Sequence, residues 1–94
     1  MGGVQAPPST RLTYAVFIEA RADKALGKLP REVQERLDPA IDALAENPRP
    51  PGSRKLSGRE GYRMRVGDYR VLYNVDDAEM TVTVTRVGHR GSIY

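Results

Sequence analysis

Arginines alternate with apolar residues between Gly61 and Tyr73, in the segment GYRMRVGDYRVLY. Successive side chains of a β-strand point to opposite faces, so Arg63 and Arg65 share one face and the apolar residues around them share the other. After the Gly67–Asp68 turn, Arg70 falls on the same face as this pair. A guanidinium group binds phosphate oxygens through a planar fork of donors. Three arginines on one sheet surface therefore predict a phosphate-binding platform.

Each of these arginines also has a purely structural interpretation. Arg63 and Arg65 would be solvated charges on an exposed strand, and Arg70 would form an ion pair with Asp68 or Glu60. The number of arginines on one face favours phosphate binding, because Arg70 lies within cross-strand reach of the other two if the hairpin closes.

The segment VGHRGSIY at the end of the chain holds three more candidates. His89 and Arg90 lie between two glycines, which allow a ligand to approach the backbone closely or allow the chain to turn. Tyr94 is the last residue. The structural alternative for all three is an ordinary flexible terminus.

Composition excludes several kinds of site. The chain has 94 residues, which is the size of one domain, and it has no cysteine and one histidine. We therefore expect no disulfide, no metal site and no cofactor, since a loop rich in glycine before a helix is also missing. No apolar run approaches the ~20 residues that span a bilayer, and MGGVQAPPST lacks the features of a signal peptide. These features predict a cytoplasmic protein without a membrane partner.

Positive charge is concentrated in the second half of the chain. The net charge is +3, and residues 52–94 carry eight basic side chains against five acidic ones, whereas residues 1–51 carry seven of each. A basic surface attracts nucleic acid, anionic lipid or an acidic protein. Lys55 and Arg59 belong to this basic half and are grouped with Arg63 and Arg65 as candidate RNA-binding residues.

Hydrophobic periodicity predicts one domain over residues 11–94, preceded by a flexible tail, 1–10. Leu12–Ile18 has the composition of a strand, and apolar residues recur at helical spacing over 22–29 and again over about Arg31–Glu46. Pro39 predicts a kink in the second helix, or a break with Asp38 as its N-cap. The prolines of NPRPPGS then predict an extended crossing to the sheet.

The rest of the sequence predicts an antiparallel meander. Its strands are Tyr62–Val66, Tyr69–Val75 and Met80–Val87, with Gly67 in a type II′ turn and a slip in the alternation at Arg86-Val87, as at a bulge. The predicted order is β-α-α-β-β-β in the α+β class. A two-helix hairpin packs on one face of a mixed, mainly antiparallel four-stranded sheet, and the other face is open.

Such a chain could cleave RNA only in an unusual way. It lacks the paired histidines of an ordinary metal-free ribonuclease and the carboxylate cluster of a two-metal nuclease. Arginine is a poor proton donor, but it stabilises the phosphorane that forms when a ribose 2′-OH attacks the adjacent phosphate. The sequence therefore indicates catalysis mainly by electrostatic stabilisation.

The segments KLSGREGYRMRVGDYRVLYNVDD and VTRVGHRGSIY resemble the RelE/ParE superfamily of bacterial and archaeal toxins, most closely its RelE branch. The likeness covers about residues 12–94. It implies a ribosome-dependent endoribonuclease, the toxin of a type II toxin-antitoxin system, which cleaves mRNA in the ribosomal A site by 2′-OH attack. It also implies inhibition by a RelB-like antitoxin, with operator DNA bound only through the toxin-antitoxin complex.

The resemblance gives roles to individual residues. Arg63 and Arg65 match the basic pair that contacts mRNA phosphates, and Arg70 matches the arginine that faces the scissile phosphate. Arg90 matches the arginine after the last strand, and Tyr94 the tyrosine that stacks on a base.

The chain departs from the RelE pattern in two ways. The basic pair is lysine in the best-known relatives, so the role of general base passes here to Tyr94 or His89, and the C-terminal helix of some relatives is missing. The alternative function is that of a ParE-like toxin, which poisons DNA gyrase without RNA cleavage. A degenerate member that binds only its antitoxin is a third interpretation.

Overall fold

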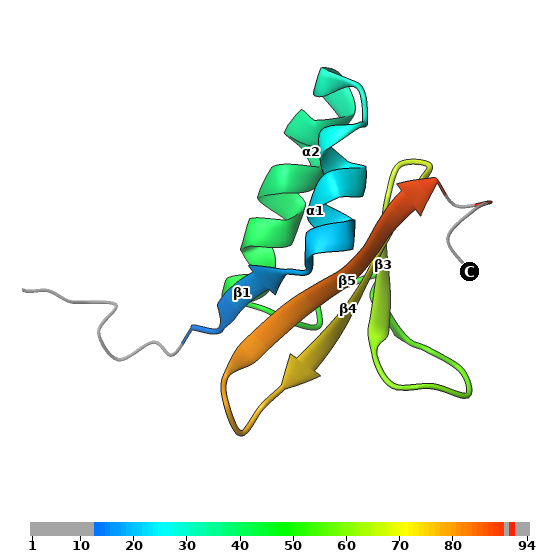
Figure 1. Cartoon of the computed structure of the whole chain (residues 1–94). Helices are drawn as coiled ribbons and strands as arrows, with labels where there is room; N and C mark the ends of the chain where they lie inside the picture. The colour runs from blue at the N-terminus through cyan, green and yellow to red at the C-terminus, as the bar shows by residue number, and fades with distance from the viewer. Residues whose placement is uncertain (1–12, 90, 92–94) are drawn as a thin grey trace, which may run out of the picture.

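Two helices and a five-stranded sheet make up the part of the chain that the computed structural model describes, residues 13–89 and 91 (Figure 1). The predicted tail, 1–10, lies outside the described residues. In chain order the elements are β1 (Ala15–Ile18), α1 (Ala20–Gly27), α2 (Arg31–Asp42), a short 3₁₀ helix (Ala43–Ala45), β2 (Arg54–Lys55), β3 (Tyr62–Val66), β4 (Tyr69–Asp76) and β5 (Thr81–His89).

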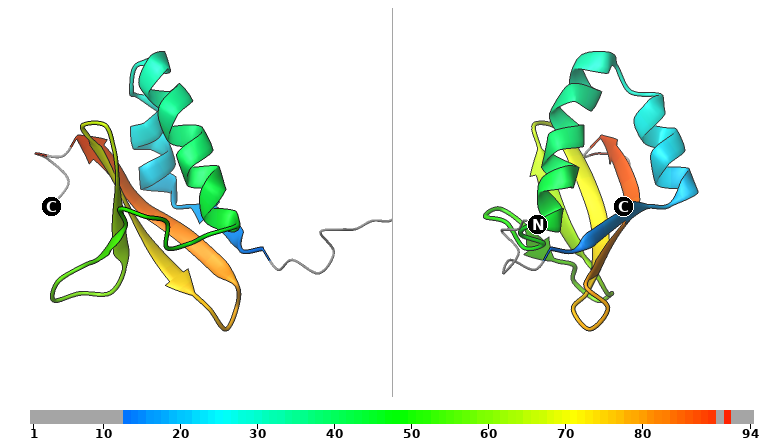
Figure 2. Two further views of the ribbon diagram at one scale, coloured as in Figure 1. Left: turned by 180° about the vertical axis from the view of Figure 1, so that it is seen from behind. Right: turned by 90° about the vertical axis from the view of Figure 1, so that its left-hand side faces the viewer.

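The sheet has the order β1-β5-β4-β3-β2. β1 pairs parallel to β5, and all other neighbours are antiparallel. Both helices lie on the same side of the sheet in Figures 1 and 2, so the opposite face has no helical cover. The predicted mixed sheet with one helix-bearing face is confirmed.

The structure corrects the predicted strand number from four to five. The crossing after α2 ends in β2, whose Arg54 and Lys55 pair with Arg63 and Tyr62 of β3. A strand of two residues has no periodicity that a sequence pattern could reveal. It nevertheless matters for function, because it adds a basic strand to the edge of the sheet.

Pro39 does not interrupt α2, which runs continuously to Asp42 before the 3₁₀ helix. The alternative of a break with Asp38 as N-cap is therefore wrong. Pro39 is exposed, and the apolar stripe of the helix on its other side packs on the sheet. This burial offsets the missing backbone hydrogen bond of the proline.

Two turns connect the last three strands. Gly67 has φ of +61°, whereas Asp68 has no positive φ, which fits the predicted type II′ hairpin between β3 and β4. The predicted start of the last strand at Met80 is wrong. Met80 has φ of +56° and closes the turn before β5, which begins at Thr81.

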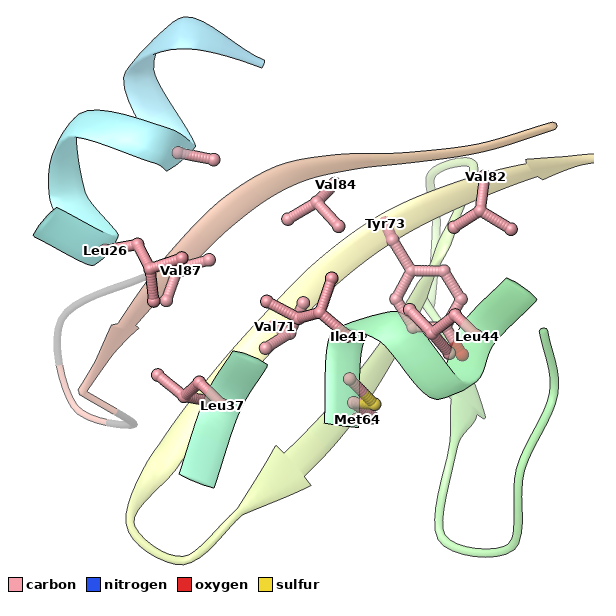
Figure 3. Close-up of a cluster of buried hydrophobic side chains, with 11 residues drawn as sticks. Leu26, Leu37, Ile41, Leu44, Met64, Val71, Tyr73, Val82, Val84 and Val87 are labelled. Carbon is pink, nitrogen blue, oxygen red and sulfur yellow. The ribbon is translucent and has the colours of Figure 1, made fainter. Parts of the chain in front are cut away.

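The core lies between the helices and the sheet (Figure 3). It contains Ala22, Leu26, Leu37, Ile41, Leu44, Met64, Val71, Tyr73, Val82, Val84 and Val87. Each large apolar side chain buried here contributes about 1.5–3 kcal/mol. Tyr73 is completely buried and its hydroxyl donates a 2.8 Å hydrogen bond to the Pro48 carbonyl, which ties the crossing after α2 to the sheet.

Candidate functional site

Five arginines stand on the sheet face that carries no helix, and we call this set the arginine face: Arg54, Arg63, Arg65, Arg70 and Arg86. The strand register places them together. Arg65 lies opposite Arg70, and Arg63 lies between Arg54 on β2 and Leu72 on β4. Leu72 in turn lies opposite Arg86 on β5. Met64 and Val71, which alternate with these residues, point into the core.

The arginine face consists of two neighbouring rows across the strands. One row runs through Arg65, Arg70 and Gly88, and the other runs through Arg54, Arg63, Leu72 and Arg86. Residues two apart along a strand are about 6.6 Å apart, which is the separation of the rows. The two rows therefore concentrate positive charge on one surface, which attracts a polyanion.

Arg70 is partly enclosed by the surrounding protein. The residue is half-buried and its Nε atom is buried. Burial fixes the direction of the side chain before a ligand arrives, which strengthens electrostatic stabilisation of a charge that develops during a reaction. Next to it, Arg54, Arg63 and Arg65 line a hollow of about 410 Å³ together with Gly52.

The structure does not bring His89 together with Arg70 on the arginine face. His89 pairs with Tyr69, and their rings meet edge to face with centroids 5.5 Å apart. Tyr69 packs against the core, and Val87, two residues before His89, belongs to it. The imidazole therefore lies at the end of β5 on the helix-bearing side.

The remaining predicted site residues divide into two groups. Arg90 and Tyr94 lie outside the described residues. Lys55 pairs with Tyr62 rather than with an arginine, and it lines a hollow of about 470 Å³ that extends to Asn74 on β4 and Thr83 on β5. Arg59 lies in the loop before β3 and lines a separate hollow of about 350 Å³. Of the four predicted RNA-binding residues, only Arg63 and Arg65 lie on the arginine face.

Arg54 and Arg86 are members of the arginine face that the sequence reasoning did not select. Arg54 was missed because β2 has no sequence signature. Arg86 follows the slip in alternation that predicted a bulge, and the structure confirms a register shift in the β4–β5 ladder. The slip was thus the available signal, since a bulge changes which face the following residues occupy.

A polar cluster holds the sheet edge near the start of β3. The Arg49 guanidinium forms a bidentate pair with Asp77, with contacts of 2.8 and 3.2 Å, and donates a 3.0 Å hydrogen bond to the Tyr62 hydroxyl. The Tyr14 hydroxyl donates to the same carboxylate. The hydrogen bonds from Arg49 and Tyr14 hold the pKa of Asp77 below its usual range. The cluster joins four separate segments and fixes Tyr62, the residue before Arg63.

Because of this cluster, we expect the stability of the fold to decrease at acidic pH. A carboxyl whose pKa is lower in the folded state stabilises the fold above its unfolded pKa, about 3.9, and this contribution is lost as the pH falls through the folded value. We expect Asp77→Asn to lower stability at pH 7 and to make urea midpoints fall less between pH 5 and pH 2.5. Asp38→Asn, an exposed carboxylate on α2, is the matched control. Parallel pH profiles for Asp77→Asn and the unmodified chain would contradict the role of the cluster.

The described part of the chain shows neither a metal-binding cluster nor a helix that could span a membrane. Residues 13–89 and 91 contain no group of three or more histidine, cysteine, aspartate or glutamate side chains that could hold a metal ion. Over the same residues, neither helix has the length and apolar character needed to cross a bilayer.

Comparison with known proteins gives consistent matches over most of the chain. Residues 16–94 match the family model described as "ParE toxin of type II toxin-antitoxin system, parDE". The toxin RelG of Mycobacterium tuberculosis is 36% identical over 87 residues, which cover 88% of this chain and 98% of that protein. Toxin RelE of the same organism is 31% identical over 83 residues, which cover 86% of both proteins.

A solved structure agrees with these sequence matches. The RelE–RelB complex of the archaeon Pyrococcus horikoshii contains a chain that superposes with a TM-score of 0.75 at 33% identity. The match covers 86% of this chain and 99% of that one. The similarity therefore includes β1, the helical hairpin and the meander that carries the arginine face.

Proposed function

Because this chain belongs to the RelE/ParE superfamily of type II toxin-antitoxin toxins, we propose that it is an endoribonuclease that cleaves mRNA in the ribosomal A site. The observation that carries this proposal is the arginine face. It gathers five guanidinium groups on the one sheet surface that the helices leave uncovered. Such a surface suits the backbone of an RNA strand, in which phosphates follow one another closely.

The proposed chemistry is attack of a ribose 2′-OH on the adjacent phosphate. The 2′ oxygen forms a bond to phosphorus, the bond from phosphorus to the 5′ oxygen breaks, and the products are a 2′,3′-cyclic phosphate and a 5′-hydroxyl. Arg70 binds the non-bridging oxygens and stabilises the extra negative charge of the phosphorane. Arg63 and Arg65 hold neighbouring phosphates and orient the strand.

The proton of the 2′-OH requires an acceptor other than arginine, because a guanidinium group stays protonated in proteins. The candidates are His89 and Tyr94. The place of His89 on the helix-bearing side counts against it. We therefore assign to Tyr94 the role of orienting the 2′-OH and accepting its proton, and to Arg90 a contact with the scissile phosphate, both by resemblance to RelE.

A ParE-like activity against DNA gyrase is the second candidate, and the matching family model favours it by name. The relatives named RelE and RelG, at 31% and 36% identity, favour RNA cleavage instead. Inducible expression of the chain, followed by mapping of mRNA 5′ ends and of DNA breaks, separates the two. Growth arrest with new mRNA 5′ ends supports the proposal, and growth arrest with gyrase-dependent DNA breaks alone would replace it with the alternative.

We further propose a RelB-like antitoxin as the partner, acidic and partly disordered, which folds on binding and carries the complex to operator DNA. Solved relatives are RelE–RelB complexes from Pyrococcus horikoshii and Escherichia coli. This chain offers both kinds of surface that such a segment would cover. Phe17 on β1 is 55% exposed, and the arginine face provides positive charge.

Co-expression with the neighbouring open reading frame is expected to restore growth and yield a stable complex. Opposite charges steer association, so stopped-flow binding should be faster at 20 mM than at 200 mM salt. An Arg63→Glu/Arg65→Glu variant should lose most of this salt dependence, whereas Lys24→Glu on α1 should retain it. Failure of the neighbouring product to bind or to rescue growth would remove the antitoxin proposal.

A further inference from the structure

Arg86 reaches the arginine face only because of the bulge in β5. Val84 lies opposite Tyr73 and points into the core, and regular alternation would then return the side chain of Arg86 to the core side. Instead the ladder places Arg86 opposite Leu72, so Thr85 is an extra residue without an opposite partner in the register. The bulge therefore sends Arg86 and Gly88 outward and Val87 into the core.

Contacts on both sides of Thr85 hold the bulge. Its hydroxyl donates a 3.3 Å hydrogen bond to the Leu72 carbonyl across the ladder. Its own carbonyl accepts a 3.2 Å hydrogen bond from Arg21 Nε at the start of α1. These two hydrogen bonds stabilise the bulge and thereby the outward position of Arg86.

Gly88 places no side chain beside Arg70. It lies directly opposite Arg70 on the arginine face and has no side chain that could exclude a ligand. Arg86 is two residues earlier on the same strand and face, about 6.6 Å along it. That distance is comparable with the spacing of successive phosphates in an extended RNA strand.

We propose that Arg86 binds the RNA phosphate next to the scissile one, so that two consecutive phosphates occupy the positions beside Gly88 and beside Arg86. This inference rests on the proposed function. Arg70 holds the reacting phosphate, and Arg86 fixes the direction in which the strand leaves the site. Arg86 is exposed, and its guanidinium is free to follow the phosphate while the bulge fixes its backbone. Its contribution is to substrate binding and positioning.

The first test measures binding to ribosomes that carry an mRNA with 2′-deoxyribose at the cleavage position, which prevents 2′-OH attack. Arg86→Ala is expected to weaken binding about five- to tenfold at 0.1 M salt. It should also reduce the slope of log K against log salt by about 0.7, the value for one phosphate contact on a single strand. Arg86→Lys should restore the slope. Arg31→Ala removes an equal charge from the distant start of α2 and should change neither quantity.

The second test identifies the phosphate. An mRNA with an uncharged methylphosphonate next to the cleavage position should weaken binding of the unmodified chain as much as Arg86→Ala does. Combining both changes should add little further loss, because both remove the same contact. Full additivity would place the contact of Arg86 elsewhere, for example on ribosomal RNA, and would overturn the assignment.

The binding measurements distinguish a failure of the proposed function from a failure of the proposed phosphate contact of Arg86. If the unmodified chain binds the ribosomes but Arg86→Ala behaves like Arg31→Ala, this inference is wrong and the proposed function stands. If the unmodified chain does not bind the ribosomes, the proposed function is wrong, and the inference about Arg86, which rests on it, is wrong too.

Discussion

Replacing Arg70 with alanine is expected to slow mRNA cleavage on programmed ribosomes at least 100-fold, with little change in substrate affinity. Arg70 lies between Arg65 and Gly88 in the strand register, and its Nε is buried. A donor held in place in this way does not need to reorganise when the phosphorane forms, and loss of one such donor typically costs 10²- to 10³-fold in rate. Single-turnover rates at saturating ribosome measure this effect separately from binding.

Two companion variants of Arg70→Ala separate chemistry from structure. Arg70→Lys keeps the charge but loses the planar fork, so it should recover only part of the rate. Arg63→Ala, on the neighbouring strand, should weaken ribosome association more than it slows the chemical step. If Arg70→Ala instead lowers thermal stability in proportion to its loss of activity, Arg70 is a structural residue and its proposed role is wrong.

The purified chain is expected to cut naked RNA about 10⁵-fold more slowly than the same sequence in the A site. The chain contains one histidine, and the structure places its ring on the side of the sheet opposite the arginine face. Without an acid-base pair of its own, the site must receive its substrate already oriented. Such orientation can be worth about 7 kcal/mol of barrier, which corresponds to about 10⁵ in rate.

The dependence of the cleavage rate on the ribosome is measured with one RNA in three states. The RNA is free, on ribosomes with the A site empty, or on ribosomes with the A site occupied by tRNA. Cleavage is expected only in the second state. Equally rapid cleavage of the free RNA at the same positions would remove the ribosome from the mechanism. It would leave the role of the arginine face in RNA cleavage intact.

The hairpin of β3 and β4 was predictable from the sequence because its signals agree. Apolar residues alternate with arginines on both strands, and Gly67 supplies the positive φ that the connecting turn requires. The two helices were also predictable, since Ala22 and Leu26 in α1, and Leu37 and Ile41 in α2, recur at helical spacing and are buried. The positions of Arg63, Arg65 and Arg70 on one face follow directly from these local patterns.

Other parts of the site depend on contacts that no local pattern contains. β2 exists because Arg54 and Lys55 meet β3 across a loop, and two residues carry no periodicity. The outward position of Arg86 depends on the bulge at Thr85, which a side chain from α1 helps to hold. A slip in the alternation indicates that a bulge is present, but it does not show which residue is bulged. The position of the bulged residue determines the face of each residue after it.

His89 illustrates the same limit. Its sequence neighbours suggest a shared site with Arg70, and simple counting along an unbroken strand from Val84 would place His89 outward. The bulge reverses this assignment and puts the imidazole against Tyr69. One extra residue in a strand thus decides which side chains can meet a ligand.

The central claim is tested most directly by the chemical nature of the cut ends. Purified chain, programmed ribosomes and an mRNA with a single cleavage position should give a 2′,3′-cyclic phosphate and a 5′-hydroxyl. The same mRNA with 2′-deoxyribose at that position should remain intact. Cleavage of the deoxy-substituted mRNA at an equal rate, or no cleavage of either mRNA alongside gyrase-dependent DNA breaks in cells, would contradict the account.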